Sequence, residues 1–237
     1  MKNIFNNLIN SMKNRYFGRI LLPFATRKIN SFKYDSIEDA INFAYNDIYG
    51  LIKPFQNKKE IYGLLKMLEE RDVKTILEIG SAYGGTLFLL SNIAPHNGVI
   101  ISIDLPAQIF KGGYPKWREK LYHSFSSNSQ KLYLIRKNSH SNEASDEVNT
   151  LLEGDNIDFL FIDGDHSYEG VKKDFNIYSK LVKENGLIGF HDIQPGPKED
   201  VGGVPEFWKE VKQNFDNHIE LIDDKNQNGL GIGLLEV

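Results

Sequence analysis

Two short segments of the chain place small and acidic residues directly after apolar runs. Residues 77–86 read Leu-Glu-Ile-Gly-Ser-Ala-Tyr-Gly-Gly-Thr, and residues 161–169 read Phe-Ile-Asp-Gly-Asp-His-Ser-Tyr-Glu. In open α/β sheets, ligands bind outside the carboxyl ends of the strands, where turn amides and acidic side chains converge. The pattern therefore predicts a small polar cofactor at the edge of a parallel sheet.

The first segment favours a cationic ligand over a dinucleotide. Its pattern is Glu-x-Gly-x-x-x-Gly, whereas a bound pyrophosphate calls for Gly-x-Gly-x-x-Gly at the start of a helix. Glu78 would repel a phosphate but suits an amino group, and Asp104, at the end of the next apolar run, could accept hydrogen bonds from two ribose hydroxyls. Taken singly, Gly80 and Gly84 are also explained by turn geometry, and Asp104 by a helix cap.

The second segment, together with a later Gly-Phe-His-Asp-Ile segment, indicates a metal site and a base. Asp163 ends one apolar run and His191 and Asp192 end the next, so on neighbouring strands these ends would lie ~4.8 Å apart. Two carboxylates and an imidazole suit Mg²⁺ or Mn²⁺, which could hold two neighbouring hydroxyls of an acceptor and lower the pKa of one. Asp165 and His166 are the candidate bases, and we favour His166 because imidazole has a pKa near neutrality.

These acidic residues also have a structural explanation. Asp165 can cap the following helix at Ser167, and Asp192 can satisfy the loop before Pro195. An acceptor pocket could include four ring-bearing residues, although aromatic residues at helical spacing more often belong to a core. These are Tyr114, Trp117, His140 and Trp208.

Hydrophobic periodicity predicts an alternation of strands and helices after two initial helices. The predicted helices cover residues 36–49, 59–70, 85–93, 117–125, 143–152, 168–184 and 202–215. The predicted strands cover residues 75–79, 99–104, 132–136, 157–162, 187–191, 219–222 and 230–236. Strands separated by helices imply a mainly parallel sheet, and the last two, with no helix between them, should be antiparallel.

Composition is typical of a globular protein with a basic amino-terminal arm. Of 237 residues, 41% are hydrophobic and 25% charged, none is cysteine, and the net charge is -4. Residues 1–33 carry seven Lys or Arg and no acid, and apolar residues between 4 and 16 recur at helical spacing. This arm could dock on the body or a second subunit, lie on an anionic membrane, or serve as a transit segment, in that order of preference. No apolar run is long enough to span a bilayer, so we expect a cytoplasmic protein with at most peripheral membrane contact through residues 1–33.

From Lys59 to Val237 the sequence resembles the class I S-adenosylmethionine-dependent methyltransferases. The resemblance implies a doubly wound, seven-stranded α/β sheet with a carboxyl-terminal antiparallel hairpin, preceded here by a helical extension at residues 1–57; the methyltransferase domain would cover 58–237. It also implies a set of cofactor-binding residues. These are Glu78, Gly80, Ser81, Gly84, Asp104, Asn138, Ser139 and Asp163.

The Ile-Asp-Gly-Asp-His-Ser-Tyr-Glu-Gly-Val and Gly-Phe-His-Asp-Ile segments narrow the resemblance. They look like a bacterial subfamily related to metal-dependent sugar O-methyltransferases, similar to macrocin O-methyltransferase. These relatives often carry two adjacent acids where this chain has His191-Asp192, a departure that bears most on His191 as a ligand.

We therefore expect an O-methyltransferase that acts on a hydroxyl of a small molecule or glycan and could form a homo-oligomer. The alternatives are a nucleotide- or nicotinamide-dependent oxidoreductase and a noncatalytic S-adenosylmethionine-binding module. A nucleic-acid partner is not expected, because the body of the chain is acidic and only the arm is basic.

Overall fold

The computed structural model describes residues 18–106, 112–127 and 129–237. Within them the strands form one seven-stranded sheet in the order β3-β2-β1-β4-β5-β7-β6. The strands are β1 (Thr75–Ile79), β2 (Val99–Ile103), β3 (Lys131–Ile135), β4 (Ile157–Ile162), β5 (Val182–His191), β6 (His218–Leu221) and β7 (Ile232–Glu236). The first five are parallel, and β7 is antiparallel to both β5 and β6. The predicted doubly wound sheet with an antiparallel carboxyl-terminal pair is confirmed.

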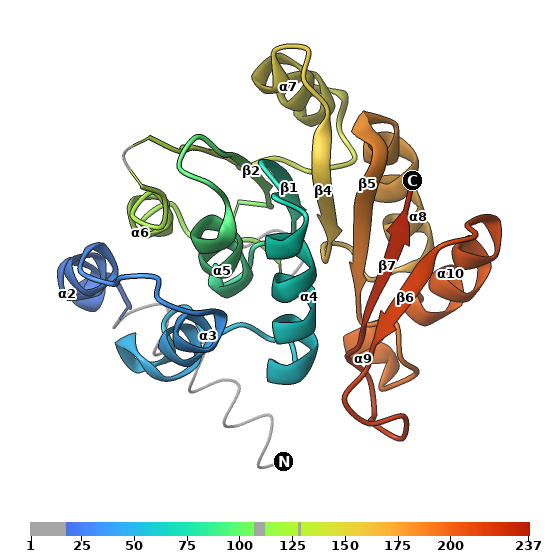
Figure 1. Cartoon of the computed structure of the whole chain (residues 1–237), viewed down its shortest axis with the longest axis horizontal. Coiled ribbons are helices and arrows are strands. Elements are labelled where there is room, and N and C mark those ends of the chain that lie inside the picture. Colours follow the sequence, from blue (N-terminus) through green and yellow to red (C-terminus); the bar gives the residue numbers. More distant parts are fainter. Residues whose placement is uncertain (1–17, 107–111, 128) are drawn as a thin grey trace.

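Helices cover both faces of this sheet (Figure 1). The α-helices are α2 (Gly18–Asn30), α3 (Ile37–Asn46), α4 (Lys58–Glu70), α5 (Gly85–Ile93), α6 (Arg118–Tyr122), α7 (Asn142–Leu152), α8 (Tyr168–Tyr178), α9 (Lys198–Val201) and α10 (Val204–Val211). Short 3₁₀ turns follow at η2 (Ile48–Gly50), η3 (Ser179–Leu181) and η4 (Lys212–Asn214). Side chains alternate along each strand, so Ile76 packs with α3, α4 and α5 on one face, while Leu77 packs with α7, α8 and α10 on the other.

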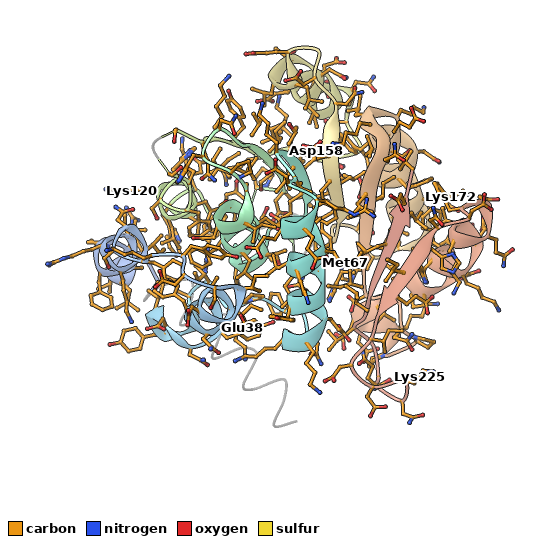
Figure 2. All side chains as sticks on the ribbon, viewed as in Figure 1. Glu38, Met67, Lys120, Asp158, Lys172 and Lys225 are labelled. Atoms are coloured by element: carbon orange, nitrogen blue, oxygen red, sulfur yellow. The ribbon has the colours of Figure 1, made fainter. Side chains whose placement is uncertain are left out.

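One carboxylate ties the amino-terminal ends of the central strands. Asp158 Oδ2 accepts hydrogen bonds from the N–H groups of Lys74 and Thr75 at 2.8 and 2.6 Å, and Asp158 also pairs with Lys183. Figure 2 shows Asp158 beside the start of β4, at the opposite end of the sheet from α9. The opposite, carboxyl-terminal edge is the one that carries the predicted ligand-binding residues.

Two predicted helices differ from the structure. The helix predicted over 168–184 ends at Tyr178, because the chain is already extended at Val182, which pairs with Ile157 ahead of an irregularity in the ladder. The helix predicted over 202–215 is shorter in the structure: α10 begins at Val204 and ends at Val211, and η4 follows. Gly202 and Gly203 precede the helix and pack closely against His166 and Tyr168.

The described part of the basic arm packs on the body. Ala25 and Ile29 of α2 are buried, and Gly18 lies so close to Trp117 and Leu51 that a β-carbon would crowd them. The helix predicted between residues 4 and 16 lies outside the described residues. None of the helices in the described ranges is both long and apolar enough to cross a bilayer.

Candidate active site

Backbone hydrogen bonds of the sheet continue into the residues just beyond the strands and hold three predicted site residues in place. The N–H of Gly80 donates to Ile103 O at 2.9 Å, and the N–H of Asp104 donates to Ile135 O at 3.0 Å. The N–H of Asp163 donates to Ile79 O at 2.8 Å. The positions after β1, β2 and β4 are therefore fixed by the sheet itself.

The two glycines of the first turn are required by close packing. Gly80 has a φ of +92°, and a β-carbon there would overlap the carbonyl of Asp163. Gly84 has a φ of +79°, and a β-carbon there would overlap the ring of Tyr122. Gly80 therefore lets the end of β4 approach the end of β1, while Gly84 serves the packing of α6.

Asp104 organises the same turn from the end of β2. Its Oδ2 accepts hydrogen bonds from the N–H groups of Ser81 and Ala82 at 3.1 and 2.9 Å, and its Oδ1 accepts from Leu105 N at 2.7 Å. Burial raises the pKa of Asp104, although these hydrogen bonds oppose the shift. Oδ1 keeps acceptor capacity for a ligand, whereas Oδ2 already accepts two hydrogen bonds.

Glu78 and Ser81 lie beneath the turn. Glu78 is fully buried, and Ser81 shares a short hydrogen bond with the hydroxyl of Ser102. Burial raises the pKa of Glu78 to about 8; a hydrogen bond with Ser81 opposes this shift, and the charges of Asp163 and Asp104 add to it. Glu78 therefore lies beneath the turn with a carboxyl group that favours its protonated form.

A cleft of about 1080 Å³ runs along the carboxyl edge of the sheet. Among the predicted cofactor residues it is lined by Gly80, Asp104, Asn138, Ser139 and Asp163. Glu78, Ser81 and Gly84 lie outside the residues that line it. The predicted catalytic residues Asp165 and His166 and metal ligands His191 and Asp192 line the same cleft, so it brings together most of the predicted site.

Asp163, His191 and Asp192 converge as expected for strand ends. Each offers one ligand atom, and these three atoms lie within 4.8 Å of one another. His191 Nδ1 lies 3.2 Å from Asp163 Oδ1 and 3.4 Å from Asp192 Oδ2. Neighbouring oxygens around an octahedral Mg²⁺ with bonds of ~2.1 Å are separated by ~3 Å. The two separations that involve His191 therefore match neighbouring ligand positions around such an ion.

The two carboxylates of this cluster favour the protonated form of His191. Burial disfavours the charged imidazole of His191, but the negative charges of Asp163 and Asp192 and their hydrogen bonds outweigh it and raise the pKa of His191 to about 10. Burial likewise acts to raise the pKa of Asp163, yet His191 and His166 hold it well below its usual range. A divalent cation would have to displace this proton, so metal binding should weaken as pH falls.

His166 lies against the two carboxylates of this cluster. Its Nδ1 lies 2.5 Å from the carbonyl oxygen of Asp200 and 3.3 Å from Asp192 Oδ2, and its Nε2 lies 3.3 Å from Asp163 Oδ1. A carbonyl oxygen only accepts, so Nδ1 carries a proton and Nε2 is the nitrogen that can take one. Gly203 N–H donates to the carbonyl of His166 and fixes its backbone.

The near-neutral pKa expected for His166 is wrong for the site without a cation. Burial lowers the pKa of this imidazole, but the hydrogen bond and charge of Asp163, with Asp192 and the carbonyl of Asp200, raise it to about 9. The sequence could not show that so many acceptors meet this ring.

Asp165 is placed at the start of α8. It is exposed, and its Oδ1 accepts a hydrogen bond from Ser167 N at 2.9 Å. The cap of α8 is Ser167 itself, whose hydroxyl accepts from Gly170 N at 3.0 Å. Asp192 has a φ of +61° and accepts a hydrogen bond from Leu230 N at 3.1 Å, so it also serves the neighbouring loop.

Two contributors to the cleft region have contacts that no sequence motif indicated. Gln56, from the segment before α4, donates through Nε2 to Asp163 Oδ2 at 2.8 Å. His140 lines the cleft, and its Nε2 lies 3.2 Å from Asp174 Oδ1, on a fully buried side chain of α8. Tyr114 and Trp208 are buried in the core and Trp117 packs against it, in agreement with the structural explanation.

Comparison with known proteins relates the central part of the chain to methyltransferases. A family model described as a methyltransferase domain matches residues 77–193. An uncharacterized protein of Acanthamoeba polyphaga mimivirus is 36% identical over 125 residues, which cover 53% of this chain and 54% of that protein. The chain thus spans about half the length of this relative.

Solved structures share the fold at low sequence identity. The O-methyltransferase TomG from Streptomyces achromogenes, in complex with S-adenosylmethionine, aligns with a TM-score of 0.56 at 16% identity, over 87% of this chain and 92% of that one. An O-methyltransferase from Bacillus cereus, in complex with S-adenosylhomocysteine, aligns with a TM-score of 0.54 at 15% identity, over 87% and 93% of the two chains. Residues 77–193 therefore match a methyltransferase domain, and the chain shares its fold with these O-methyltransferases.

Proposed function

We propose that the chain transfers a methyl group from S-adenosylmethionine to a hydroxyl of a small molecule or glycan, with a divalent metal ion at Asp163, His191 and Asp192. One observation carries this proposal. A single cleft is lined by the turn residues Gly80 and Asp104 and by the metal-ligand cluster with His166 beside it. A methyl donor at the turn would therefore face an acceptor at the cluster.

Different residues around the turn would bind different parts of the methyl donor. Asp104 Oδ1, with one N–H bond already made, would accept the ribose hydroxyls, and Asn138 and Ser139 would face the adenine. Glu78, beneath the turn, would favour the cationic amino and sulfonium groups through its negative charge. Binding a cation near Glu78 would in turn favour loss of its proton.

The reaction requires positioning and one proton acceptor. An acceptor oxygen attacks the methyl carbon in line as the carbon–sulfur bond breaks, which leaves S-adenosylhomocysteine, and the hydroxyl proton passes to Nε2 of His166. A metal ion bound at the cluster would hold the acceptor oxygens and lower the pKa of the attacking hydroxyl. Its charge would also offset those of Asp163 and Asp192, so that the pKa of His166 falls from about 9 toward neutrality.

The extension before residue 58 would belong to the site as well as to the scaffold. Phe55 lines the cleft and Gln56 contacts Asp163, although both precede the proposed domain boundary. For residues 18–30, burial of Ala25 and Ile29 supports docking on the body over attachment to a membrane surface.

Calorimetry separates this proposal from its alternatives. We expect S-adenosylhomocysteine to bind and nicotinamide dinucleotides not to bind, because the turn lacks the glycine spacing for a pyrophosphate. Cell extracts incubated with the enzyme and isotopically labelled S-adenosylmethionine should then yield a labelled small molecule or glycan. Binding of a nicotinamide dinucleotide alone would overturn the proposal, and cofactor binding without any labelled product would favour a noncatalytic module.

Excess chelator tests the metal. Methyl transfer should stop while S-adenosylhomocysteine still binds, and Mg²⁺ or Mn²⁺ should restore it, because the ion is proposed to act on the acceptor. Full activity in chelator would exclude a required metal and leave the methyltransferase assignment standing.

A further inference from the structure

The side-chain amide of Gln56 lies at the back of the metal-ligand cluster. Gln56 is 5% exposed and comes from the segment before α4, 107 positions from Asp163 in the sequence. Its Nε2 donates to Asp163 Oδ2 at 2.8 Å. The other carboxylate oxygen, Oδ1, lies 3.3 Å from His166 Nε2 and 3.2 Å from His191 Nδ1. The two oxygens of Asp163 therefore have separate partners.

A second hydrogen bond holds the oxygen end of this amide. Thr86, in the first turn of α5, donates through Oγ1 to Gln56 Oε1 at 2.8 Å, and Thr86 is itself buried. Because the carboxylate of Asp163 only accepts, Nε2 must face it, and Oε1 then accepts from Thr86. The hydroxyl of Tyr45 donates to the backbone carbonyl of Gln56, so the backbone is held as well. The chain Thr86–Gln56–Asp163 joins the helix after the glycine turn to the metal-ligand cluster.

We propose that Gln56 is a positioning residue that sets Asp163 as a ligand through Oδ1 alone. The inference rests on the proposed metal function of Asp163. A neutral donor at Oδ2 keeps the carboxylate ionised and stops it from rotating into a two-oxygen mode. Partners that orient ligating carboxylates in this way commonly change metal affinity by 10- to 100-fold when they are removed.

Three substitutions separate this role from simple packing. Gln56→Leu removes the amide at similar volume, and Thr86→Val removes only the hydroxyl that bonds to Oε1. The matched control is Gln130→Leu. Gln130 Nε2 donates to the carbonyls of Ser91 and Ala94 at 2.9 and 2.8 Å, and Gln130 is not among the residues that line the cleft.

The measurements are Mn²⁺ affinity by electron paramagnetic resonance, S-adenosylhomocysteine affinity by calorimetry, and stability by urea unfolding. Gln56→Leu should weaken Mn²⁺ binding by about 10- to 100-fold, and Thr86→Val by less. Gln130→Leu should lose comparable stability but keep wild-type Mn²⁺ affinity. S-adenosylhomocysteine affinity should stay within about threefold in every variant, because none of the substituted side chains lines the cleft.

The results distinguish failure of the positioning role of Gln56 from failure of the proposed metal site. Wild-type Mn²⁺ affinity in Gln56→Leu would overturn the positioning role and leave the metal site intact. Equal losses in Gln56→Leu and Gln130→Leu would show that general stability, and not orientation of Asp163, sets the affinity. If the wild-type protein binds S-adenosylhomocysteine but no Mn²⁺, the metal function and the role of Gln56 both fail, while the methyltransferase assignment stands.

Discussion

The buried carboxyl of Glu78 should make the stability of the protein fall as pH rises. Its pKa is raised by burial from an ordinary value of 4.5 to about 8, so the native state holds this proton more tightly than the unfolded state does. The stabilising effect is fully present below pH 4.5 and is lost as pH rises through 8. For these two pKa values, the linkage relation gives a loss of about 3 kcal/mol between pH 5.5 and 8.5.

The variant Glu78→Gln isolates this loss, because an amide of the same shape carries no titrating proton. Urea unfolding of both proteins at pH 5.5 and 8.5 gives four free energies of unfolding. Other groups with raised pKa values, such as His166 and His191, titrate in both proteins and cancel in the comparison. The wild-type protein should lose about 3 kcal/mol more than the variant over this interval. Equal losses in the two proteins would refute the reasoning.

Three further predictions follow from the site. Gly80→Ala should lower the free energy of unfolding, measured in urea, by at least ~2 kcal/mol, because the new β-carbon would overlap Asp163. The control Gly154→Ala has a φ of +97° but no neighbouring atom within 4 Å, so it should lower this free energy by only ~1 kcal/mol. Asp104→Asn should weaken S-adenosylhomocysteine binding by about 10- to 100-fold in calorimetry, since a charged acceptor of two hydroxyls is lost; unchanged affinity would refute its ribose role. His166→Ala should lower turnover by roughly 100- to 10,000-fold while S-adenosylhomocysteine still binds, and a loss seen only in Asp165→Asn would reverse the choice of base.

Strand ends were predictable from the sequence because their position depends on local pattern. An apolar run followed by Asp104, Asp163 or His191-Asp192 marks a strand and the residue just beyond it, and parallel strands bring such residues to one edge. That reasoning placed the cleft and the cluster correctly. The same reasoning could not predict contacts with side chains that come from distant parts of the chain.

Gln56 and Gly84 illustrate that limit. Gln56 reaches Asp163 across 107 positions from a loop without periodicity, so no pattern in the sequence points to it. Gly84 fits a cofactor motif, yet its structural reason is the ring of Tyr122, which belongs to a different element. The direction of Ser81, toward Ser102 and away from the cleft, likewise depends on packing beneath the turn.

The position of β7 between β5 and β6 has a consequence for biosynthesis. β7 is synthesised after β5 and β6 but lies between them, and it pairs with β5 from Leu187 to His191. Until residues 232–236 are available, β5 has an unpaired edge on a hydrophobic sheet, and exposed edges of this kind promote association between chains. His191 and Asp192 lie at the end of β5, and Asp192 accepts from Leu230 just before β7. Completion of the cleft therefore requires residues 230–236, and the nascent chain keeps an exposed edge of β5 until this segment has been synthesised.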